Sequence, residues 1–184
     1  MTGYVAFLRA VNVGRRTVAM ERLREEFAGL GLAGVSTYIN SGNVIFSASE
    51  PPARLEARIE GRLDQAFVFE VTTFVRTTSS VTAIAAYKPF GLVGPDQTHL
   101  VAFLRRAPKA AAKTAIESLS NEVDTLEVYG GEVHWLIQGR VMDSTIKPKD
   151  WAILGHHSYT TRNTTMLAKL AAKWNSPGTK GGRK

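Results

Sequence analysis

A short apolar segment occurs twice in this chain of 184 residues, and the repeat restricts the choice of fold more than any other feature. Residues 5–10 read VAFLRA, and residues 101–106 read VAFLRR. A looser echo links YINSGNVIF at 38–46 with EVYGGEVHWL at 127–136. Both pairs stand at matching places within the same order of predicted elements. We interpret this as an internal duplication, which predicts two similar folding units in tandem.

The first unit has the hydrophobic pattern of strand, helix, strand, strand, helix, strand. A tight Ser-Gly-Asn turn joins the second and third strands. This βαββαβ order is typical of the ferredoxin-like fold. The predicted elements are strands at 4–11, 35–40, 44–47 and 69–77, and helices at 18–30 and after Pro51 and Pro52.

The second unit repeats this order as far as its third strand. Its predicted elements are strands at 99–106, 123–129 and 133–137, and helices at 108–119 and 163–174. A closing strand is either missing or lies within 141–154. The fold class is therefore predicted to be α+β: a tandem pair of ferredoxin-like βαββα(β) subdomains, with mainly antiparallel sheets and helices on one face. The predicted boundaries are 1–78 and 98–174 for the subdomains, 79–97 for a connecting helix and linker, and 175–184 for a disordered basic tail.

Composition excludes several kinds of site. The chain has no cysteine, so disulfides, thiol catalysis and cysteine-ligated zinc are ruled out. Its four histidines cannot be assembled into a metal site from their spacing. We expect no metal and no cofactor.

No apolar run approaches the roughly 18 residues that a membrane span needs, and no signal peptide is recognisable. The sequence predicts a cytoplasmic protein with no membrane partner.

The predicted topology brings two polar loops together. In a βαββαβ sheet the third strand inserts between the first and second strands. The loop after the first strand and the hairpin before the third then emerge at the same edge. This places Asn12 and Gly14 near Ser41, Gly42 and Asn43. Glycine lets a backbone approach a ligand, and Asn and Ser supply donors and acceptors. The same residues also suit tight turns, so a ligand site and plain turn chemistry both stay open.

Three arginines interrupt otherwise predictable patterns. Arg9 interrupts a predicted buried strand, and Arg105 repeats this placement in the second unit. Arg162 precedes the last helix, where the helix dipole disfavours a cation, and Asn163 is a candidate cap. A bound anion would explain these arginines. A structural ion pair or exposure to solvent would also explain them, and is the more usual reason for such an arginine.

Three motifs resemble the signature of domain-of-unknown-function family 1697. LRAVNVGR at 8–15 is similar to the family's L-R-G-I-N-V-G-G, and TYINSGNVIF at 37–46 to its T-Y-I-x-S-G-N-V-x-F. TTRNTTMLAKL at 160–170 is similar to its T-x-R-N-W-N-T-V-x-K-L. Ala10 and Arg15 stand where the family usually has glycine, and Thr164 where it has tryptophan. The resemblance covers about 1–174 and implies two ferredoxin-like subdomains, but the family has no established activity.

The motif residues coincide with the edge predicted from topology. We hypothesise that the TTRN segment folds back onto that edge, so that Arg9 and Arg162 converge. The candidate ligand-binding residues are Arg9, Asn12, Gly14, Tyr38, Ser41, Gly42, Asn43, Arg162 and Asn163.

Three functions remain open. The first is a site for a small-molecule anion or nucleotide at the edge formed by the 12–15 loop and the 41–43 hairpin, in a binding protein or an enzyme. The second is nucleic-acid binding, favoured by the formal net charge of +7 and the basic tail but without a recognisable motif. The third is a protein-interaction module that uses an exposed strand edge. The sequence does not indicate the oligomeric state.

Overall fold

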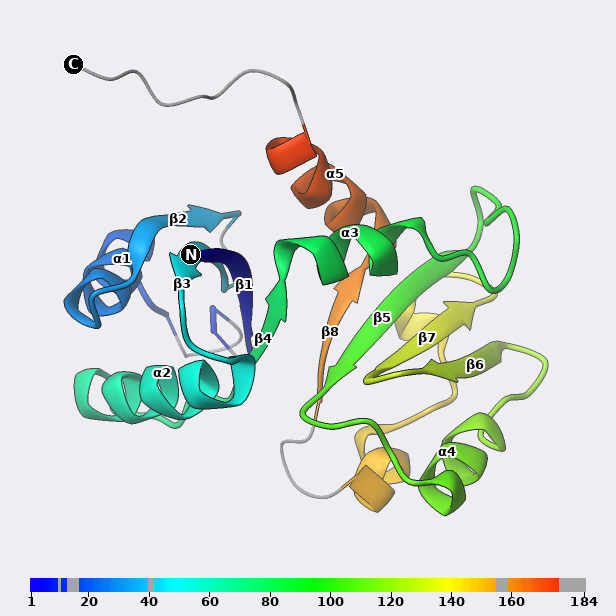
Figure 1. The fold of residues 1–184 in the computed structure, drawn as a ribbon. Coiled ribbons are helices and arrows are strands. Elements are labelled where there is room, and N and C mark those ends of the chain that lie inside the picture. Colours follow the sequence, from blue (N-terminus) through cyan, green and yellow to red (C-terminus); the bar gives the residue numbers. More distant parts are fainter. Residues whose placement is uncertain (10, 13–16, 40–41, 155–158, 176–184) are drawn as a thin grey trace.

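The fold of the first half is βαββαβα (Figure 1). We describe it from a computed structural model that covers residues 1–9, 11–12, 17–39, 42–154 and 159–175. The elements of this half are β1 (Thr2–Leu8), α1 (Met20–Gly29), β2 (Ala33–Tyr38), β3 (Asn43–Ala48), α2 (Pro52–Ala66), β4 (Thr73–Thr77) and α3 (Thr78–Ala86).

The second half repeats this order with one substitution, because two short 3-10 helices replace the second crossover helix. Its elements are β5 (Thr98–Leu104), α4 (Ala110–Glu117), β6 (Asp124–Tyr129), β7 (Glu132–Ile137), η1 (Val141–Asp143), η2 (Pro148–Leu154), β8 (Tyr159–Asn163) and α5 (Thr164–Asn175). No helix within the described residues is both long and apolar enough to cross a membrane.

Two four-stranded antiparallel sheets form the framework of the protein. The strand order is β2-β3-β1-β4 in the first sheet and β6-β7-β5-β8 in the second. In each sheet the third strand of the unit lies between the first and the second, as the ferredoxin-like pattern requires. The predicted fold class is thus confirmed. The domain boundaries and the duplication stay predictions, and residues 176–184 of the predicted tail lie outside the described residues.

The closing strand of the second sheet is found later in the chain than the sequence indicated. It was expected to be missing or to lie within 141–154, and this expectation is wrong. Those positions hold η1 and η2, and the strand is β8, which pairs with β5 from Leu100 opposite Asn163 to Leu104 opposite Tyr159. The sequence YTTRN has no apolar run, so β8 is held by pairing with a buried neighbour and not by its own hydrophobicity.

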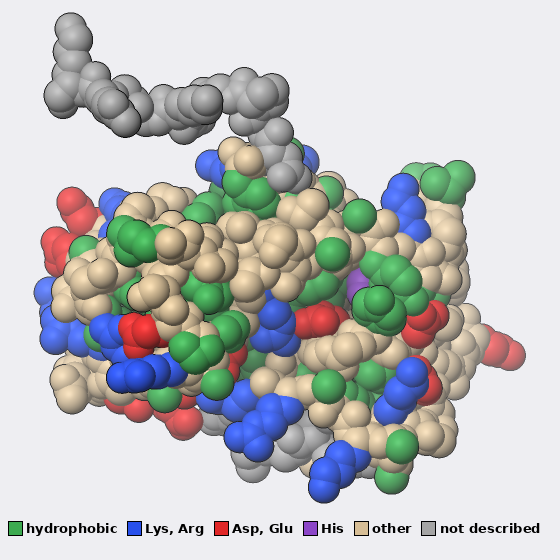
Figure 2. Space-filling model, viewed as in Figure 1, with side chains coloured by type: hydrophobic (Ala, Val, Ile, Leu, Met, Phe, Trp, Pro, Cys, Tyr) green, Lys and Arg blue, Asp and Glu red, His purple; other side chains and the backbone are tan. Residues whose placement is uncertain are grey.

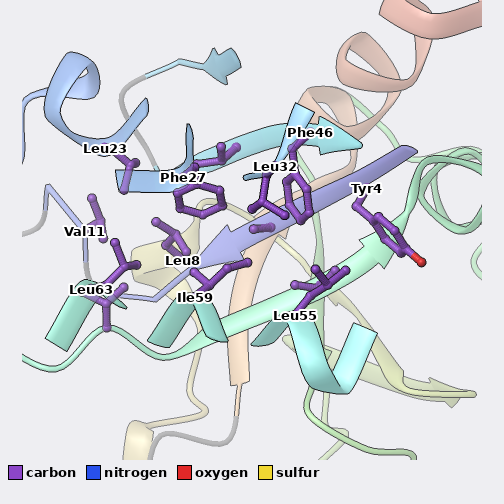
Figure 3. Packing of buried hydrophobic residues seen from close by; sticks show 14 of the residues in the cluster. Tyr4, Leu8, Val11, Leu23, Phe27, Leu32, Phe46, Leu55, Ile59 and Leu63 are labelled. Carbon is purple, nitrogen blue, oxygen red and sulfur yellow. The ribbon is translucent and has the colours of Figure 1, made fainter. Parts of the chain in front are cut away.

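Each sheet has its own core on one face. In the first sheet, alternate β1 residues Tyr4, Ala6 and Leu8 point towards α1 and α2, where they meet side chains such as Phe27 and Ile59 (Figure 3). The second sheet packs in the same way against α4 and η2. These helices lie on the outer sides of the molecule in Figure 1.

A third core joins the two sheets through their other faces. Phe7 of β1 and Phe103 of β5 stack there with ring centroids 4.2 Å apart. Helix α3 contributes Val81 and α5 contributes Leu167 to the same cluster. The two helices also pack against each other, and Trp174 donates its indole N–H to Thr82 at 3.0 Å. The described parts of the two halves therefore share one continuous interior.

Candidate functional site

The described parts of the two loops predicted to meet beside β1 do lie together. We call this region the first rim: the described residues that follow β1 (9, 11–12 and 17–19) and those between β2 and β3 (39 and 42). Leu8 N–H donates to the Gly42 carbonyl at 2.8 Å. Gly42 has a φ of +69°, and a Cβ there would lie 3.1 Å from the Leu8 Cβ and 3.2 Å from the Val11 Cβ. Gly42 thus allows the hairpin to pack directly on β1. Gly14 and Ser41 lie outside the described residues.

Arg162 reaches the first rim from the other half of the chain. It points out of β8 towards the first sheet and is buried. Its Nε donates to Asn43 Oδ1 at 2.6 Å, and one terminal nitrogen donates to the Leu8 carbonyl at 2.9 Å. The other terminal nitrogen donates to Thr160 Oγ1 at 2.9 Å and to the Thr161 carbonyl at 2.8 Å. Burial lowers the pKa of Arg162 to about 10, so it is still charged at neutral pH. It serves here as a bridge between the sheets.

The remaining predicted residues of the first rim also have partners. Arg9 is half-buried, and its Nε donates to the Tyr159 carbonyl at 3.1 Å, next to the segment that carries Arg162. Asn12 has a φ of +57°, and its Oδ1 accepts a 2.7 Å hydrogen bond from Val18 N–H. The TTRN segment therefore does lie against this rim.

The two other candidates flank helix α5. Asn163 caps it, because its Oδ1 accepts a 2.9 Å hydrogen bond from Met166 N–H. The Lys173 ammonium lies 4.8 Å from the centre of the Tyr38 ring. A role of the nine predicted residues in ligand binding stays a prediction.

The second sheet has an equivalent rim, which the sequence analysis did not single out. We call it the second rim: the residues after β5 (105–109) and the Gly130-Gly131 turn. Leu104 N–H donates to the Gly131 carbonyl at 2.9 Å, as Leu8 N–H does to Gly42. The register pairs Phe103 with Glu132, as it pairs Phe7 with Asn43.

Five residues at or beside the second rim thus correspond to five predicted residues at or beside the first rim. Arg105, Tyr129, Gly131, Glu132 and Arg76 take the places of Arg9, Tyr38, Gly42, Asn43 and Arg162, respectively.

A cavity of about 690 Å³ opens at the second rim, between that rim and α3. Its volume is in the range of small-molecule sites. Three arginines line it, Arg76, Arg105 and Arg106, whereas Glu132 is the only carboxylate among the lining residues of this cavity. On the face drawn in Figure 2, basic side chains are spread among acidic and hydrophobic ones. The electrostatics of the cavity therefore favour an anion.

Two tyrosines form the aromatic part of the cavity wall. Tyr87, at the end of α3, stacks on Tyr129 with ring centroids 4.6 Å apart and an angle of 25° between the planes. The Tyr87 hydroxyl donates to Glu127 Oε1 at 2.5 Å, and this hydrogen bond raises the pKa of Tyr87. The stack fixes both rings, while Tyr129 remains 59% exposed.

A pair of buried histidines lies behind this wall. His99 Nε2 and His134 Nδ1 are 3.1 Å apart, and the Tyr87 ring packs edge-on to His134. Burial, reinforced by the neighbouring His99, lowers the pKa of His134 to about 4, and burial also lowers that of His99. Among the described residues, no group of three or more His, Cys, Asp or Glu could hold a metal ion. The sequence placed both histidines in strands, but only the pairing of β5 with β7 brings the two rings together.

The comparisons with known proteins agree with this fold. A conserved bacterial protein, SP0830 from Streptococcus pneumoniae, has a solved structure that superposes with a TM-score of 0.69. The match covers 96% of this chain and 99% of that chain at 20% sequence identity, so it supports the fold alone. A profile described as protein of unknown function (DUF1697) matches residues 1–134.

The chain belongs to the DUF1697 family. The resemblance carried by the motifs at 8–15 and 37–46 is thereby confirmed. No curated protein matches this DUF1697 sequence. The family has no assigned function, so a function for this member has to be argued from its own side chains.

Proposed function

We propose that this DUF1697 protein binds a small organic anion in the cavity at the second rim. The observation that carries the proposal is the composition of the cavity wall, in which three arginines face a single carboxylate beside a stacked pair of tyrosines. Ligand sites combine an apolar wall with a few polar groups that fix the orientation of the ligand.

Arg106 is the residue that we expect to bind the charge. It is exposed, it is the second residue after β5, and no hydrogen bond or ion pair engages its guanidinium within the described part of the chain. A guanidinium can hold a carboxylate or phosphate through two parallel N–H donors.

The first rim is our second candidate place for the same function. Among its described residues it would offer Arg9, which is half-buried. Lys173 of α5 lies over the Tyr38 ring, and Arg162 holds Asn43 at the start of β3. The two rims are equivalent in topology but differ in charge, because Glu132 stands where the first rim has Asn43.

Isothermal titration with a panel of organic anions tests the proposal. We expect saturable binding by at least one of them, weakened about tenfold or more in Arg106→Gln, since charge-assisted hydrogen bonds are strong. Arg54→Gln is the matched control, because it removes the same charge from the exposed face of α2 and should leave binding unchanged. Arg9→Gln reports on the first rim in the same assay.

Three outcomes would overturn the proposal. The first is a lack of binding by every anion up to about 10 mM, which is weaker than a useful affinity. The second is binding that Arg106→Gln leaves intact and Arg9→Gln abolishes, which moves the site to the first rim. The third is binding only to RNA or DNA, with a steep dependence on salt, which favours a nucleic-acid partner.

A further inference from the structure

Two of the three arginines in the cavity are already neutralised by the protein. Arg76 donates from Nε to Glu132 Oε1 at 2.6 Å, and from its terminal nitrogens to the Leu104 carbonyl at 2.6 Å and the Val75 carbonyl at 3.0 Å. The side chains of Arg76 and Glu132 are 16% and 10% exposed, respectively. This pair is part of the framework, and it has little capacity left for a ligand.

Arg105 is engaged in a similar way. Both of its terminal nitrogens donate to the carboxylate of Glu60, which comes from α2 of the other subdomain. Glu60 also accepts the N–H of Thr73 at 2.8 Å, which holds it in place against β4. The charge of Arg105 is therefore balanced by a fixed carboxylate, and Arg106 is left as the one uncompensated charge among the lining residues.

The pairing of these arginines also limits the charge of the ligand. Glu132 lines the cavity but is paired with Arg76, and Glu127 accepts a hydrogen bond from the hydroxyl of the lining residue Tyr87. A ligand with several negative charges would therefore have only Arg106, among the lining residues, to offset them. A second negative charge that is desolvated without a partner raises the free energy of binding.

The side chains of the cavity wall indicate the chemistry of the uncharged part of the ligand. Tyr129 lines the cavity and is 59% exposed, although its ring is fixed by stacking on Tyr87. Ala83, Ile84 and Ala107 add small apolar surfaces and no polar side-chain atoms. A fixed, exposed aromatic ring in an apolar wall favours a second aromatic ring in offset-stacked or edge-to-face contact.

We propose that the cavity at the second rim binds an aromatic monoanion, with its carboxylate on Arg106 and its ring against Tyr129. This inference rests on the proposed function, and it adds that the ligand carries one negative charge and an aromatic ring. A nucleoside triphosphate is then a poor ligand for this cavity, despite the three arginines.

Four probes test the single negative charge and the aromatic ring of the ligand separately in one titration series: phenylacetate, phenylacetamide, cyclohexylacetate and ATP. We expect phenylacetate to bind best. Phenylacetamide, which lacks the charge, should bind about tenfold more weakly, and ATP should also bind more weakly than phenylacetate. Cyclohexylacetate, which keeps the charge and loses the aromatic ring, should bind about fivefold more weakly.

Two variants assign these differences to residues. Arg106→Gln should remove the preference for phenylacetate over phenylacetamide. Tyr129→Leu should remove the preference for phenylacetate over cyclohexylacetate, and the folded state should tolerate it because this side chain is largely exposed. Circular dichroism of each variant shows whether it is folded.

The possible outcomes test this inference separately from the proposed function on which it rests. If ATP binds more tightly than phenylacetate and Arg106→Gln weakens ATP binding, the inference is wrong and the anion site stands. If cyclohexylacetate binds as well as phenylacetate, the aromatic part of the inference is wrong. If phenylacetate, cyclohexylacetate and ATP all fail to bind, the inference is wrong. Binding of other anions from the broader panel would then leave the proposed function intact.

Discussion

Arg162 Nε donates a hydrogen bond of 2.6 Å to Asn43 Oδ1 across 119 positions of the chain. Arg76 Nε makes the equivalent contact in the opposite direction, to Glu132 Oε1 at 2.6 Å. The two guanidiniums lie over a central pair of rings, with Arg162 at 5.5 Å from Phe7 and Arg76 at 5.7 Å from Phe103. In each sheet, an arginine of the closing strand thus contacts the other sheet, and these reciprocal contacts join the two halves.

Replacing Arg162 should destabilise the whole protein. Arg162→Met leaves the Leu8 carbonyl and the Asn43 amide oxygen buried without their donor, and we expect it to lower the free energy of unfolding by about 3 kcal/mol. Arg162→Lys keeps the charge but lacks the forked donors, so its loss should be intermediate. Urea denaturation measures both. Arg54→Met is the control, since an exposed arginine on α2 should change stability by less than about 0.5 kcal/mol. A loss below about 1 kcal/mol for Arg162→Met would contradict the bridging role.

Two glycines with similar backbone conformations should respond differently to alanine. Gly42 and Gly31 have φ angles of +69° and +73°, so Ala introduces comparable backbone strain, about 1 kcal/mol, at either position. At Gly42 the new methyl group also meets Leu8 and Val11, whereas at Gly31 no atom lies within 4 Å. We expect Gly42→Ala to cost about 1–2 kcal/mol more than Gly31→Ala in chemical denaturation. Equal losses would show that the hairpin does not need to pack closely on β1.

Stability should fall on acidification through the titration of the histidine pair. The pKa of His134 is lowered to about 4 in the folded protein, from about 6.5 when unfolded. The unfolded state therefore binds more protons between these values. The stability is fully present above pH 6.5 and decreases as the pH falls towards 4, by about 3 kcal/mol in total.

Thermal melts between pH 4 and pH 7 measure this slope. His134→Leu removes the titrating group from the buried site and should flatten the slope in this window. His99 remains in that variant as the second histidine of the pair, with its pKa lowered by burial, so a shallow residual slope is expected. An unchanged slope would mean that groups elsewhere control the acid response.

Asp124 should hold the segment that follows β7 against the second sheet. Its Oδ1 accepts the Trp135 indole N–H at 2.7 Å, and its Oδ2 accepts the N–H and the hydroxyl of Thr145, each at 2.8 Å. Burial alone would raise the pKa of Asp124, but hydrogen bonds from Ser144, Trp135 and Thr145 together lower it. Asp124→Asn presents an N–H₂ group to these donors, so we expect a loss of about 2 kcal/mol at pH 7.

The pH dependence provides a second test at this position. A lowered pKa contributes stability that is present above the unfolded value near 3.9 and is lost as the pH falls through the folded value. Asp124→Asn should therefore differ most from the parent protein above pH 4 and least at lower pH. Asp64→Asn, at an exposed position on α2, is the control and should follow the parent curve. A constant difference at every pH would show that the carboxylate charge is unimportant.

The elements that the sequence predicted well are those with local signals. Strand β1 alternates residues between two buried faces, so it reads as a continuous apolar run. Helix α2 begins at Pro52, directly after Pro51, and has Leu55, Ile59 and Leu63 on one face. The sequence did not predict strand β8, because its residues have no local hydrophobic pattern typical of a strand. Its five residues include two threonines, an arginine and an asparagine, and they are ordered by pairing with β5.

The candidate site was predictable only in part. The meeting of the two loops at the first rim follows from strand order, and Leu8 and Gly42 do meet there. The second rim could have been found by carrying the same argument through the repeat, since Arg105 and the Gly130-Gly131 turn were already visible. The cavity itself could not have been found, because its third wall is α3, and no pattern in the sequence states against which sheet face a connecting helix packs.

By itself, the amino-acid sequence determined two βαββ units, their hairpin turns and the loops that meet beside the first strand of each. These features could be predicted locally, because hydrophobic spacing and turn residues involve only a few neighbouring positions. Only the tertiary structure decided which arginines are held by the protein and which of those lining the cavity is left for a ligand. Arg76, Arg105 and Arg162 find their partners 56, 45 and 119 residues away, whereas Arg106 meets none among the described residues. The charge available to a ligand depends on these distant pairings, because a guanidinium and a carboxylate cancel only when the fold brings them into contact.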